Sequence, residues 1–469
     1  MPTTVEHCNV MNASLRRVVA PGLSMLRTQL ARHGRALPGF VEREFEAFIG
    51  CGDPTAGFGW LTCEACDHHR LVPFSCKGRG FCPACGGRRM TTAARRWTDT
   101  VLPRVAVRQW VVTVPWSRRW LLARRSDLAR GVLRIALSEI QRWTNVHGVQ
   151  PRRPGGRTGS ITVIQRFGSA LNLNLHFHIL VLDGLYAIDP RTGALRWVRA
   201  RRPSTAEVER VVERVAERAE AWLARGGFSG DEPTDDDPDD AQATIQAAAV
   251  MGRSALRQGR RARRIQILGG RPHALPPRCA TCDGYTVHAG VAIGARNRKG
   301  LERLCRYIAR PPLAKERLEE KADGSLRLHL KRPWSDGTVA FVFSKAELVE
   351  RLAALIPPPH KNQVLYHGVL APRAAWRPLV VPRIRPRTRD ERKRRDAEVL
   401  TRTPSAAKTP RWEPWRTLLE RTFGADGFAC PNCFRRMRLR AVVMPPATLR
   451  VLDGLNAASR APPDERVAS

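Results

Sequence analysis

Apolar residues near the start of the chain recur with a helical period. They are spaced by mixed steps of three and four residues: Leu15, Val18, Val19, Leu23 and Leu26. This spacing places them on one face of an α-helix. We therefore expect residues 12–48 to form a helical segment.

Three further stretches, at about 126–146, 205–224 and 298–318, also read as helices. The last of them contains Pro311 and Pro312. Proline lacks the backbone N–H that a helix interior needs, so we expect that helix to be broken there.

Between the helical stretches lie runs rich in β-branched and aromatic residues, which favour strands. The expected strands are 109–116, 159–168, 172–186, 284–295, 326–332 and 337–343. The strands at 159–168 and 172–186 are joined by a short loop, and the last two also form a hairpin, which indicates antiparallel pairing. A few antiparallel strands connected by helices predict an α+β fold.

Charge narrows the class of protein. The chain has 469 residues, with 80 Lys plus Arg against 43 Asp plus Glu and a formal net charge of +37. A compact protein with such an excess repels itself unless a polyanion neutralises it, and nucleic acid is the usual partner. Two polar stretches stand apart: residues 229–242 are acidic and read as an exposed insertion, and residues 383–411 are a basic linker.

Membrane association is not expected. No apolar run approaches the roughly 20 residues of a membrane-spanning helix, and the first thirty residues have only short, charge-interrupted apolar stretches. A signal peptide would need a continuous apolar segment there. We therefore expect an intracellular protein.

Eight of the twelve cysteines form four C-x-x-C pairs: Cys63/Cys66, Cys82/Cys85, Cys279/Cys282 and Cys430/Cys433. In a reducing compartment such pairs are typical zinc ligands. The first two pairs are separated by fifteen residues, which matches a four-cysteine zinc pattern. We predict that Cys63, Cys66, Cys82 and Cys85 hold one structural Zn²⁺, because four thiolates leave no open position for a substrate.

Other groups near this pattern leave alternatives open. Cys76, His68 and His69 are close enough in sequence to replace one ligand or to hold a second ion. The pair Cys430/Cys433 is half a site, which Cys279/Cys282 or a second chain would complete, or it binds no metal.

The stretch "LNLNLHFHIL" at residues 171–180 places His176 and His178 two positions apart in a strand. Residues i and i+2 of a strand share a face, so both imidazoles can bind one metal ion. Candidates for a third ligand are Gln165, Asp183 and His288, and Asn172 and Asn174 share the alternation of the histidines.

Tyr307, one of four tyrosines, lies among cations in the last predicted helix. Nearby positive charge favours a phenolate, which is a competent nucleophile. The alternative is a tyrosine that only packs. We predict that DNA phosphates contact nine basic residues in two groups: Lys77, Arg79, Arg88 and Arg89 near the cysteines, and Arg298, Lys299, Arg303, Arg306 and Arg310 around Tyr307.

Four segments together resemble the transposases of the insertion sequence 91 family, within the HUH (His-hydrophobe-His) endonucleases. They are "LVPFSCKGRGFCPACGGRRM", "GSALNLNLHFHILVLDGLY", "VHAGVAIGARNRKGLERLCRYIARPPLA" and "LIPPPHKNQVLYHGVLAP", and the resemblance runs from about Cys51 to about Pro382. It implies that His176 and His178 bind a catalytic divalent ion and that Tyr307 is the nucleophile. Many members have a second tyrosine four residues away, but Arg303 and Pro311 occupy those positions here. The chain therefore resembles the single-tyrosine branch found in common-region elements.

The resemblance implies an HUH-type antiparallel sheet flanked by helices and preceded by a small zinc-binding module. The expected units are a helical segment 1–48, a zinc-binding domain 49–98, a catalytic domain 99–382, and a C-terminal part 383–469 with the basic linker and a C-x-x-C pair. The implied activity is rolling-circle transposition: cleavage and rejoining of single-stranded DNA at element ends through a 5′-phosphotyrosine, with Mg²⁺ or Mn²⁺ at the histidines. The implied location is the bacterial cytoplasm, at the nucleoid, and a homo-oligomer is allowed.

Two other functions stay open from the sequence. One is a plasmid replication initiator or relaxase of the same superfamily, and the other is an inactive relative that only binds DNA. The zinc-binding segment favours the transposase over the first, and the intact His176, His178 and Tyr307 favour activity over the second.

Overall fold

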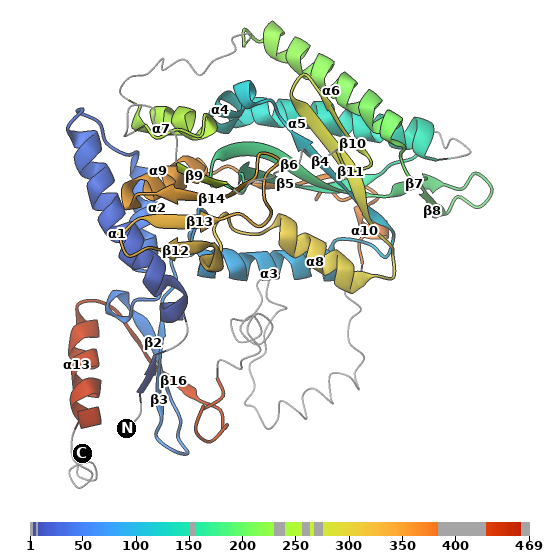
Figure 1. The fold of residues 1–469 in the computed structure, drawn as a ribbon. Coiled ribbons are helices and arrows are strands. Elements are labelled where there is room, and N and C mark those ends of the chain that lie inside the picture. The colour runs from blue at the N-terminus through green and yellow to red at the C-terminus, as the bar shows by residue number, and fades with distance from the viewer. Residues whose placement is uncertain are drawn as a thin grey trace.

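The computed structural model describes residues 3–5, 8–149, 155–228, 240–255, 263–266, 275–382 and 428–460. Residues 229–239 of the predicted acidic insertion and the predicted linker at 383–411 lie outside these ranges. The fold combines helices with sheets that are antiparallel except for the parallel pair β1–β3, in line with the α+β fold that the sequence predicts (Figure 1).

A six-stranded antiparallel sheet forms the centre of the larger unit. Its strand order is β10 (Cys279–Cys282), β11 (Tyr285–Ile293), β4 (Val107–Thr113), β6 (Leu173–Leu182), β5 (Gly159–Phe167) and β15 (Val364–Gly368). The predicted antiparallel pairing of residues 159–168 with 172–186 is confirmed, with Gln165 opposite His176 and Val163 opposite His178. The predicted strand at 172–186 is divided into β6 and β7 (Gly184–Ile188), and β7 pairs with β8 (Leu195–Arg199) in a projecting hairpin.

Helices cover both faces of this sheet (Figure 1). On one face, α5 (Ser126–Trp143) and α6 (Thr205–Arg225) share a core with Phe177 and Ile179 of β6. On the other, α3 (Pro83–Thr100) and α8 (Arg298–Ile308) share a core with Leu180 and Leu182. Successive strand residues point to opposite faces, which explains why β6 is apolar on both sides. Helix α8 ends three residues before Pro311, as the sequence predicts.

A second antiparallel sheet lies beside the first, in the order β12 (Leu318–Glu320), β13 (Leu326–His329), β14 (Thr338–Phe343) and β9 (Arg263–Gln266). The predicted hairpin of 326–332 with 337–343 is confirmed as β13 and β14. The predicted N-terminal helix consists of two helices, α1 (Cys8–Ala31) and α2 (Gly39–Ile49). They pack with α9 (Lys345–Leu355), and a Cβ on Gly22 of α1 would lie only 2.6 Å from the Lys345 carbonyl oxygen. The N-terminal helices are therefore part of the larger unit's core.

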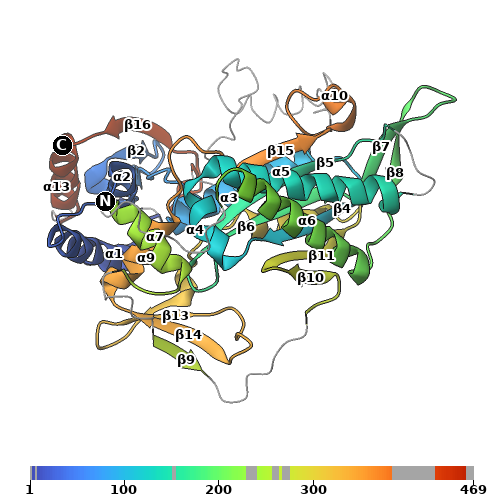
Figure 2. The same ribbon diagram turned by 90° about the horizontal axis from the view of Figure 1, so that it is seen from above.

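A smaller sheet contains both early and late parts of the chain. Its order is β1 (Thr3–Val5), β3 (His69–Pro73), β2 (Phe58–Thr62) and β16 (Arg438–Val443), with β16 antiparallel to β2. The helix α13 (Ala447–Arg460) lies beside this sheet (Figures 1 and 2). The C-terminal C-x-x-C segment thus adds a strand to the zinc-binding module.

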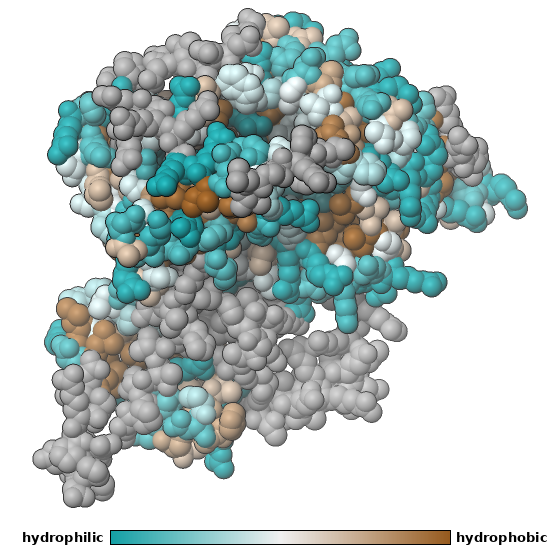
Figure 3. Space-filling view, viewed as in Figure 1, coloured by the Kyte–Doolittle hydropathy of each residue, from teal (hydrophilic) through white to brown (hydrophobic). Residues whose placement is uncertain are grey.

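The remaining elements are short connections. They are α4 (Trp116–Arg124), α7 (Ala241–Val250), α10 (Arg377–Val380) and the single turns η1 (Pro54–Ala56), η2 (Thr144–Gly148) and η3 (Lys315–Arg317). Hydrophilic residues predominate on the face seen in Figure 3, interrupted by smaller hydrophobic areas. Among the described helices, none has the length and apolar content to cross a membrane.

An ion pair within the larger unit supports a stability prediction. Arg108 of β4 and Asp183 after β6 are 2% and 5% exposed, and Nε and Nη2 of Arg108 donate to the two carboxylate oxygens at 2.8 and 3.0 Å. Removal of one partner leaves the other charge buried and uncompensated. We expect Asp183→Ala to lower the free energy of unfolding by about 3–5 kcal/mol, measured by urea denaturation.

The matched control is Asp99→Ala, because Asp99 pairs with Arg95 at 3.1 Å on the surface and is 54% exposed. Exposed pairs contribute at most about 1 kcal/mol. If the two variants lose the same free energy of unfolding, burial of the Arg108–Asp183 pair is not the reason for its effect on stability.

Candidate zinc centres and active site

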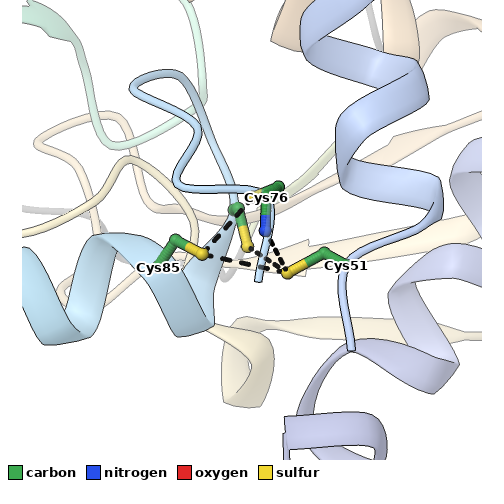
Figure 4. A group of neighbouring side chains, drawn as sticks. Cys51, Cys76 and Cys85 are labelled. Carbon is green, nitrogen blue, oxygen red and sulfur yellow. Dashed lines mark hydrogen bonds between the residues drawn. The ribbon is translucent and has the colours of Figure 1, made fainter. Parts of the chain in front are cut away.

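Four cysteines meet where the smaller sheet joins the larger unit. Cys51 follows α2, Cys76 follows β3, and Cys82 and Cys85 lie at the start of α3. The Cys51 sulfur is 3.8 Å from those of Cys82 and Cys85, and the Cys76 and Cys85 sulfurs are 3.4 Å apart. Figure 4 shows the sulfurs of Cys51, Cys76 and Cys85 turned toward a common centre. A tetrahedral ion with Zn–S bonds of about 2.3 Å requires sulfurs about 3.8 Å apart, so this group fits a structural Zn²⁺.

Contacts within this group lower the pKa of two thiols, Cys51 and Cys85, and raise the pKa of the other two, Cys76 and Cys82. Hydrogen bonds from Cys76 and then Cys82 lower the pKa of the Cys51 thiol to about 7. Contacts with Cys51 and then Cys76 hold the pKa of Cys85 far below its ordinary value. A thiolate, not a thiol, is the metal ligand.

A second group of four cysteines joins distant parts of the chain. Cys63 and Cys66 lie in the turn between β2 and β3, and Cys430 and Cys433 precede β16. The sulfurs of Cys63 and Cys433 are 3.4 Å apart, and those of Cys66 and Cys430 are 3.5 Å apart. These distances also fit one tetrahedral Zn²⁺.

The predicted single site of Cys63, Cys66, Cys82 and Cys85 is therefore wrong in its grouping. The five residues of β3 extend about 17 Å and carry the Cys63/Cys66 turn away from the start of α3. Cys76 belongs to the first group of four, as one of the alternatives allowed. The half-site Cys430/Cys433 is completed by Cys63/Cys66, and not by Cys279/Cys282, which form β10 of the central sheet.

His68 and His69, which follow the Cys63/Cys66 pair, each have a hydrogen-bond partner at Nδ1. Nδ1 of His68 lies 3.3 Å from the Asn432 amide nitrogen, and Nδ1 of His69 accepts a hydrogen bond from Trp60 Nε1 at 3.1 Å. Sequence spacing missed Cys51 as a ligand because it is a lone cysteine outside any C-x-x-C pair.

His176 and His178 lie side by side on β6, with ring centroids 4.9 Å apart. Nδ1 of His176 is 2.9 Å from the Asn174 carbonyl oxygen, which can only accept, so this nitrogen carries the hydrogen and Nε2 keeps a free lone pair. Nε2 of His178 is buried with no hydrogen-bond partner in the described structure. Burial lowers the pKa of His176 to about 4 and that of His178 to about 2. Both imidazoles are therefore neutral at neutral pH, the form that binds metal.

Tyr307 approaches the histidines from α8. Its ring centroid is 5.9 Å from that of His178, with the ring planes at 85°, and its side chain is 47% exposed. The guanidinium of Arg310 lies 4.4 Å from the centre of the tyrosine ring. The sequence-predicted nucleophile and the sequence-predicted metal ligands thus come together from separate elements, and the tyrosine is open to solvent.

The other three tyrosines make different contacts. Tyr285 is fully buried and donates its hydroxyl to Glu220 at 2.7 Å. Tyr366 accepts a hydrogen bond from Trp97 Nε1 at 2.9 Å, and Tyr186 packs against Trp197. Of the four tyrosines, all of which lie within the described residues, only Tyr307 has a ring contact with either histidine.

The candidates for a third ligand differ sharply in their surroundings. Gln165 is opposite His176, its side-chain nitrogen donates to the Ile308 carbonyl at 2.6 Å, and its side-chain oxygen is buried without a partner. Asp183 is held by Arg108. His288 shares the face of the sheet but lies two strands from His178, a lateral distance of about 10 Å.

The nine predicted DNA-contacting residues also differ. Arg298 is committed to the fold, because it donates to the backbone carbonyls of Thr98, Leu102 and Pro103 at the end of α3. Arg306 pairs with Glu302 at 2.8 Å. Arg79 and Arg89 are exposed but donate to the carbonyls of Lys361 and of Lys77 and Gly78. Lys77, Lys299 and Arg303 are exposed, and Arg88 and Arg310 are half-buried.

Comparison with protein families places the chain among DNA-processing enzymes. Residues 159–376 match the Y2_Tnp family of transposases, and residues 24–114 match the transposase zinc-binding domain of the insertion sequence 91 type. The first match includes the two histidines and Tyr307, and the second includes all four cysteines of the first zinc group. The protein is therefore a transposase.

More specifically, the chain belongs to the insertion sequence 91 family of transposases, with an N-terminal zinc-binding module. The two matches together cover about two thirds of the chain. No curated protein and no solved structure shows significant similarity to it.

Proposed function

We propose that the chain cleaves and rejoins single-stranded DNA at the ends of its element by an HUH-type mechanism, with Tyr307 as nucleophile, and so drives rolling-circle transposition. The observation that carries this proposal is the exposed Tyr307 ring, 5.9 Å from His178, whose Nε2 is buried without a partner.

The residues present fit a hard divalent ion, Mg²⁺ or Mn²⁺. Nε2 of both histidines and the side-chain oxygen of Gln165 would hold it. These are nitrogen and oxygen donors, and the buried ones have no protein partner. The Gln109 amide lies 2.7 Å from Nδ1 of His178. The Gln109 atom that faces Nδ1 is the amide nitrogen, which donates; metal binding at Nε2 therefore requires this amide to turn, so that its oxygen accepts a hydrogen bond from Nδ1. The ion would act as a Lewis acid on the scissile phosphate.

The protein's own part is to position and supply the nucleophile. The Tyr307 hydroxyl loses its proton as its oxygen attacks phosphorus, and the bond from phosphorus to the 3′ oxygen breaks. The products are a 5′-phosphotyrosine and a 3′-hydroxyl, which takes up a proton. Attack of a 3′-hydroxyl on the phosphotyrosine reverses these changes, so strands are rejoined without an external energy source. Arg310, beside the ring, stabilises negative charge on the phosphate during the attack.

The proposal predicts separate effects on cleavage and binding. We expect His176→Ala and His178→Ala each to reduce cleavage about 100-fold or more, because the loss of a ligand removes the Lewis acid. DNA affinity should stay within about twofold, because the ion acts on the chemical step and the basic residues that contact the DNA phosphates are unchanged. The measurement is nicking of single-stranded oligonucleotides from the gene's own flanks with Mg²⁺ or Mn²⁺, beside fluorescence anisotropy for binding.

His288→Ala is the matched control, because His288 shares the same face of the sheet without contact with Tyr307. It should cleave normally. If affinity falls as much as cleavage in the His176 and His178 variants, the two histidines are structural and the metal site is wrongly placed.

A further inference from the structure

The two C-x-x-C turns of the second cysteine group have the same backbone. In each turn, the residue after the second cysteine donates its amide hydrogen to the carbonyl of the first cysteine: Asp67 to Cys63 at 2.8 Å, and Phe434 to Cys430 at 2.9 Å. Both of these residues have a positive φ, 52° for Asp67 and 58° for Phe434. The left-handed conformation therefore belongs to this kind of turn, whichever side chain occupies the position.

Phe434 is poorly suited to this position. In the left-handed conformation the Cβ of an L-residue crowds the backbone carbonyl, and only Gly, Asn and Asp adopt it routinely. Packing offers no compensation, because Phe434 is 83% exposed, the largest fraction among the exposed large hydrophobic side chains that the structure describes. The turn is held by backbone hydrogen bonds in which the phenyl ring takes no part. A side chain that is both strained and exposed points to a ligand rather than to folding.

The residues that follow Phe434 are basic. Four exposed arginines lie between it and the middle of β16: Arg435, Arg436, Arg438 and Arg440. The first two have no carboxylate partner within the described residues. The third pairs with Glu64 at 2.7 Å, but only at the surface, where the two side chains are 70% and 64% exposed. The guanidinium of the fourth lies 4.4 Å from the centre of the Trp60 ring. The turn thus presents a free aromatic ring directly beside two unpaired cations.

This combination fits single-stranded nucleic acid. Proteins bind such strands by stacking bases on aromatic side chains, and basic residues contact the phosphates on either side. The smaller sheet that carries the turn lies apart from α8 (Figure 1). A strand that reaches this turn is therefore held at a place separate from Tyr307.

We propose that the turn after Cys430 is a DNA-binding site, in which one unpaired base stacks on the ring of Phe434 and the adjacent phosphates bind Arg435 and Arg436. This inference rests on the proposed function for its ligand, single-stranded DNA, but uses none of the cleavage chemistry. The C-terminal segment, which lies outside both family matches, then makes a DNA contact of its own.

The test replaces Phe434 by glycine in a protein that also carries Tyr307→Phe and so cannot cleave. Fluorescence anisotropy with a single strand from the gene's flanks should show affinity lower by about 5- to 100-fold, because one stacked base is lost. The melting temperature should not fall, since glycine adopts a positive φ without strain. A lower melting temperature with unchanged affinity would show that Phe434 serves folding and would overturn the proposal. Phe434→Tyr keeps a stacking ring and should restore affinity to within about twofold.

Two changes of condition separate stacking from charge. A fully abasic strand has the same phosphates but no bases, so proteins with and without Phe434→Gly should bind it equally; a remaining loss would mean that the ring does not stack on a base. Arg435→Gln and Arg436→Gln should each lower the slope of log affinity against log salt by about 0.7, whereas Phe434→Gly should leave this slope unchanged. An unaltered slope in both arginine variants would refute the phosphate contacts.

Leu449→Ala is the matched control, because Leu449 on α13 is a hydrophobic side chain of the same unit that is 57% exposed. It should bind the strand normally, and an equal loss of affinity there would contradict a specific site at Phe434. A duplex hides its bases, so Phe434→Gly should not weaken duplex binding; an equal loss on duplex would refute the unpaired base. Normal wild-type cleavage with no effect of Phe434→Gly refutes this site alone. Weaker binding by Phe434→Gly without any adduct at Tyr307 refutes the tyrosine mechanism alone.

Discussion

Replacement of Tyr307 by phenylalanine is expected to abolish strand cleavage and the covalent protein–DNA adduct together. The substitution removes one oxygen and almost no volume from a side chain that is 47% exposed. The free energy of unfolding should therefore change by less than about 1.5 kcal/mol. Loss of a nucleophile removes the covalent route entirely, so cleavage should fall by about 1,000-fold or more.

The measurement is a denaturing gel with 3′-labelled single-stranded DNA and Mg²⁺ or Mn²⁺. A 5′-phosphotyrosine joins the protein to the labelled fragment, so the adduct migrates as labelled protein, and peptide mapping identifies the residue. Tyr366→Phe is the control: it loses the hydrogen bond from Trp97, which contributes about 1 kcal/mol of stability, and should cleave normally.

A purely packing role for Tyr307 predicts the reverse pattern. Nicking would then persist in Tyr307→Phe, or the adduct would map to Tyr186, Tyr285 or Tyr366. Either result would remove Tyr307 as the nucleophile while leaving the metal site to be tested through the histidines.

The second large effect concerns zinc. We expect two tightly bound Zn²⁺ per chain, where the sequence alone predicts one, because the cysteines form two groups of four. Cys85→Ser and Cys430→Ser should each reduce the content to about one ion. Each loss should also destabilise the smaller sheet, since metal binding in small modules contributes much of the folding free energy.

Metal analysis of purified protein, together with thermal unfolding, measures both effects. Cys282→Ser is a matched control, because Cys282 belongs to a C-x-x-C pair that lies on β10 outside both groups. It should retain two ions and the wild-type melting temperature. Well-folded protein with one ion, or Cys430→Ser protein with two, would contradict the second centre.

Local patterns account for what the sequence predicted correctly. The alternation of residues in "LNLHFHIL" places His176 and His178 on one face, and β6 has that register. Pro311 and Pro312 limit α8, and the short loop after 159–168 yields an antiparallel neighbour. Each of these depends on interactions between residues close together in the chain.

The errors have a different physical origin. The zinc ligands were grouped by sequence distance, but the β2–β3 hairpin separates Cys66 from Cys82, and only the tertiary fold brings Cys430 to Cys66. We predicted Arg298 as a DNA contact because it is basic, but its guanidinium donates hydrogen bonds to backbone carbonyls at the end of α3. The closeness of Tyr307 to His178 followed from the resemblance to a family, since residues 129 positions apart carry no local signal of contact.

The second group of four cysteines can form only late during synthesis of the chain. Cys66 and Cys430 are 364 residues apart, and a ribosome adding about 5–20 residues per second needs about 20–70 s to pass from one to the other. Throughout that interval the Cys63/Cys66 half-site has no intramolecular partner, and β2 lacks its neighbour β16. The second group of cysteines is complete only after residue 433 has emerged. A chain that terminates before residue 430 therefore lacks half of the second cysteine group and the strand that pairs with β2.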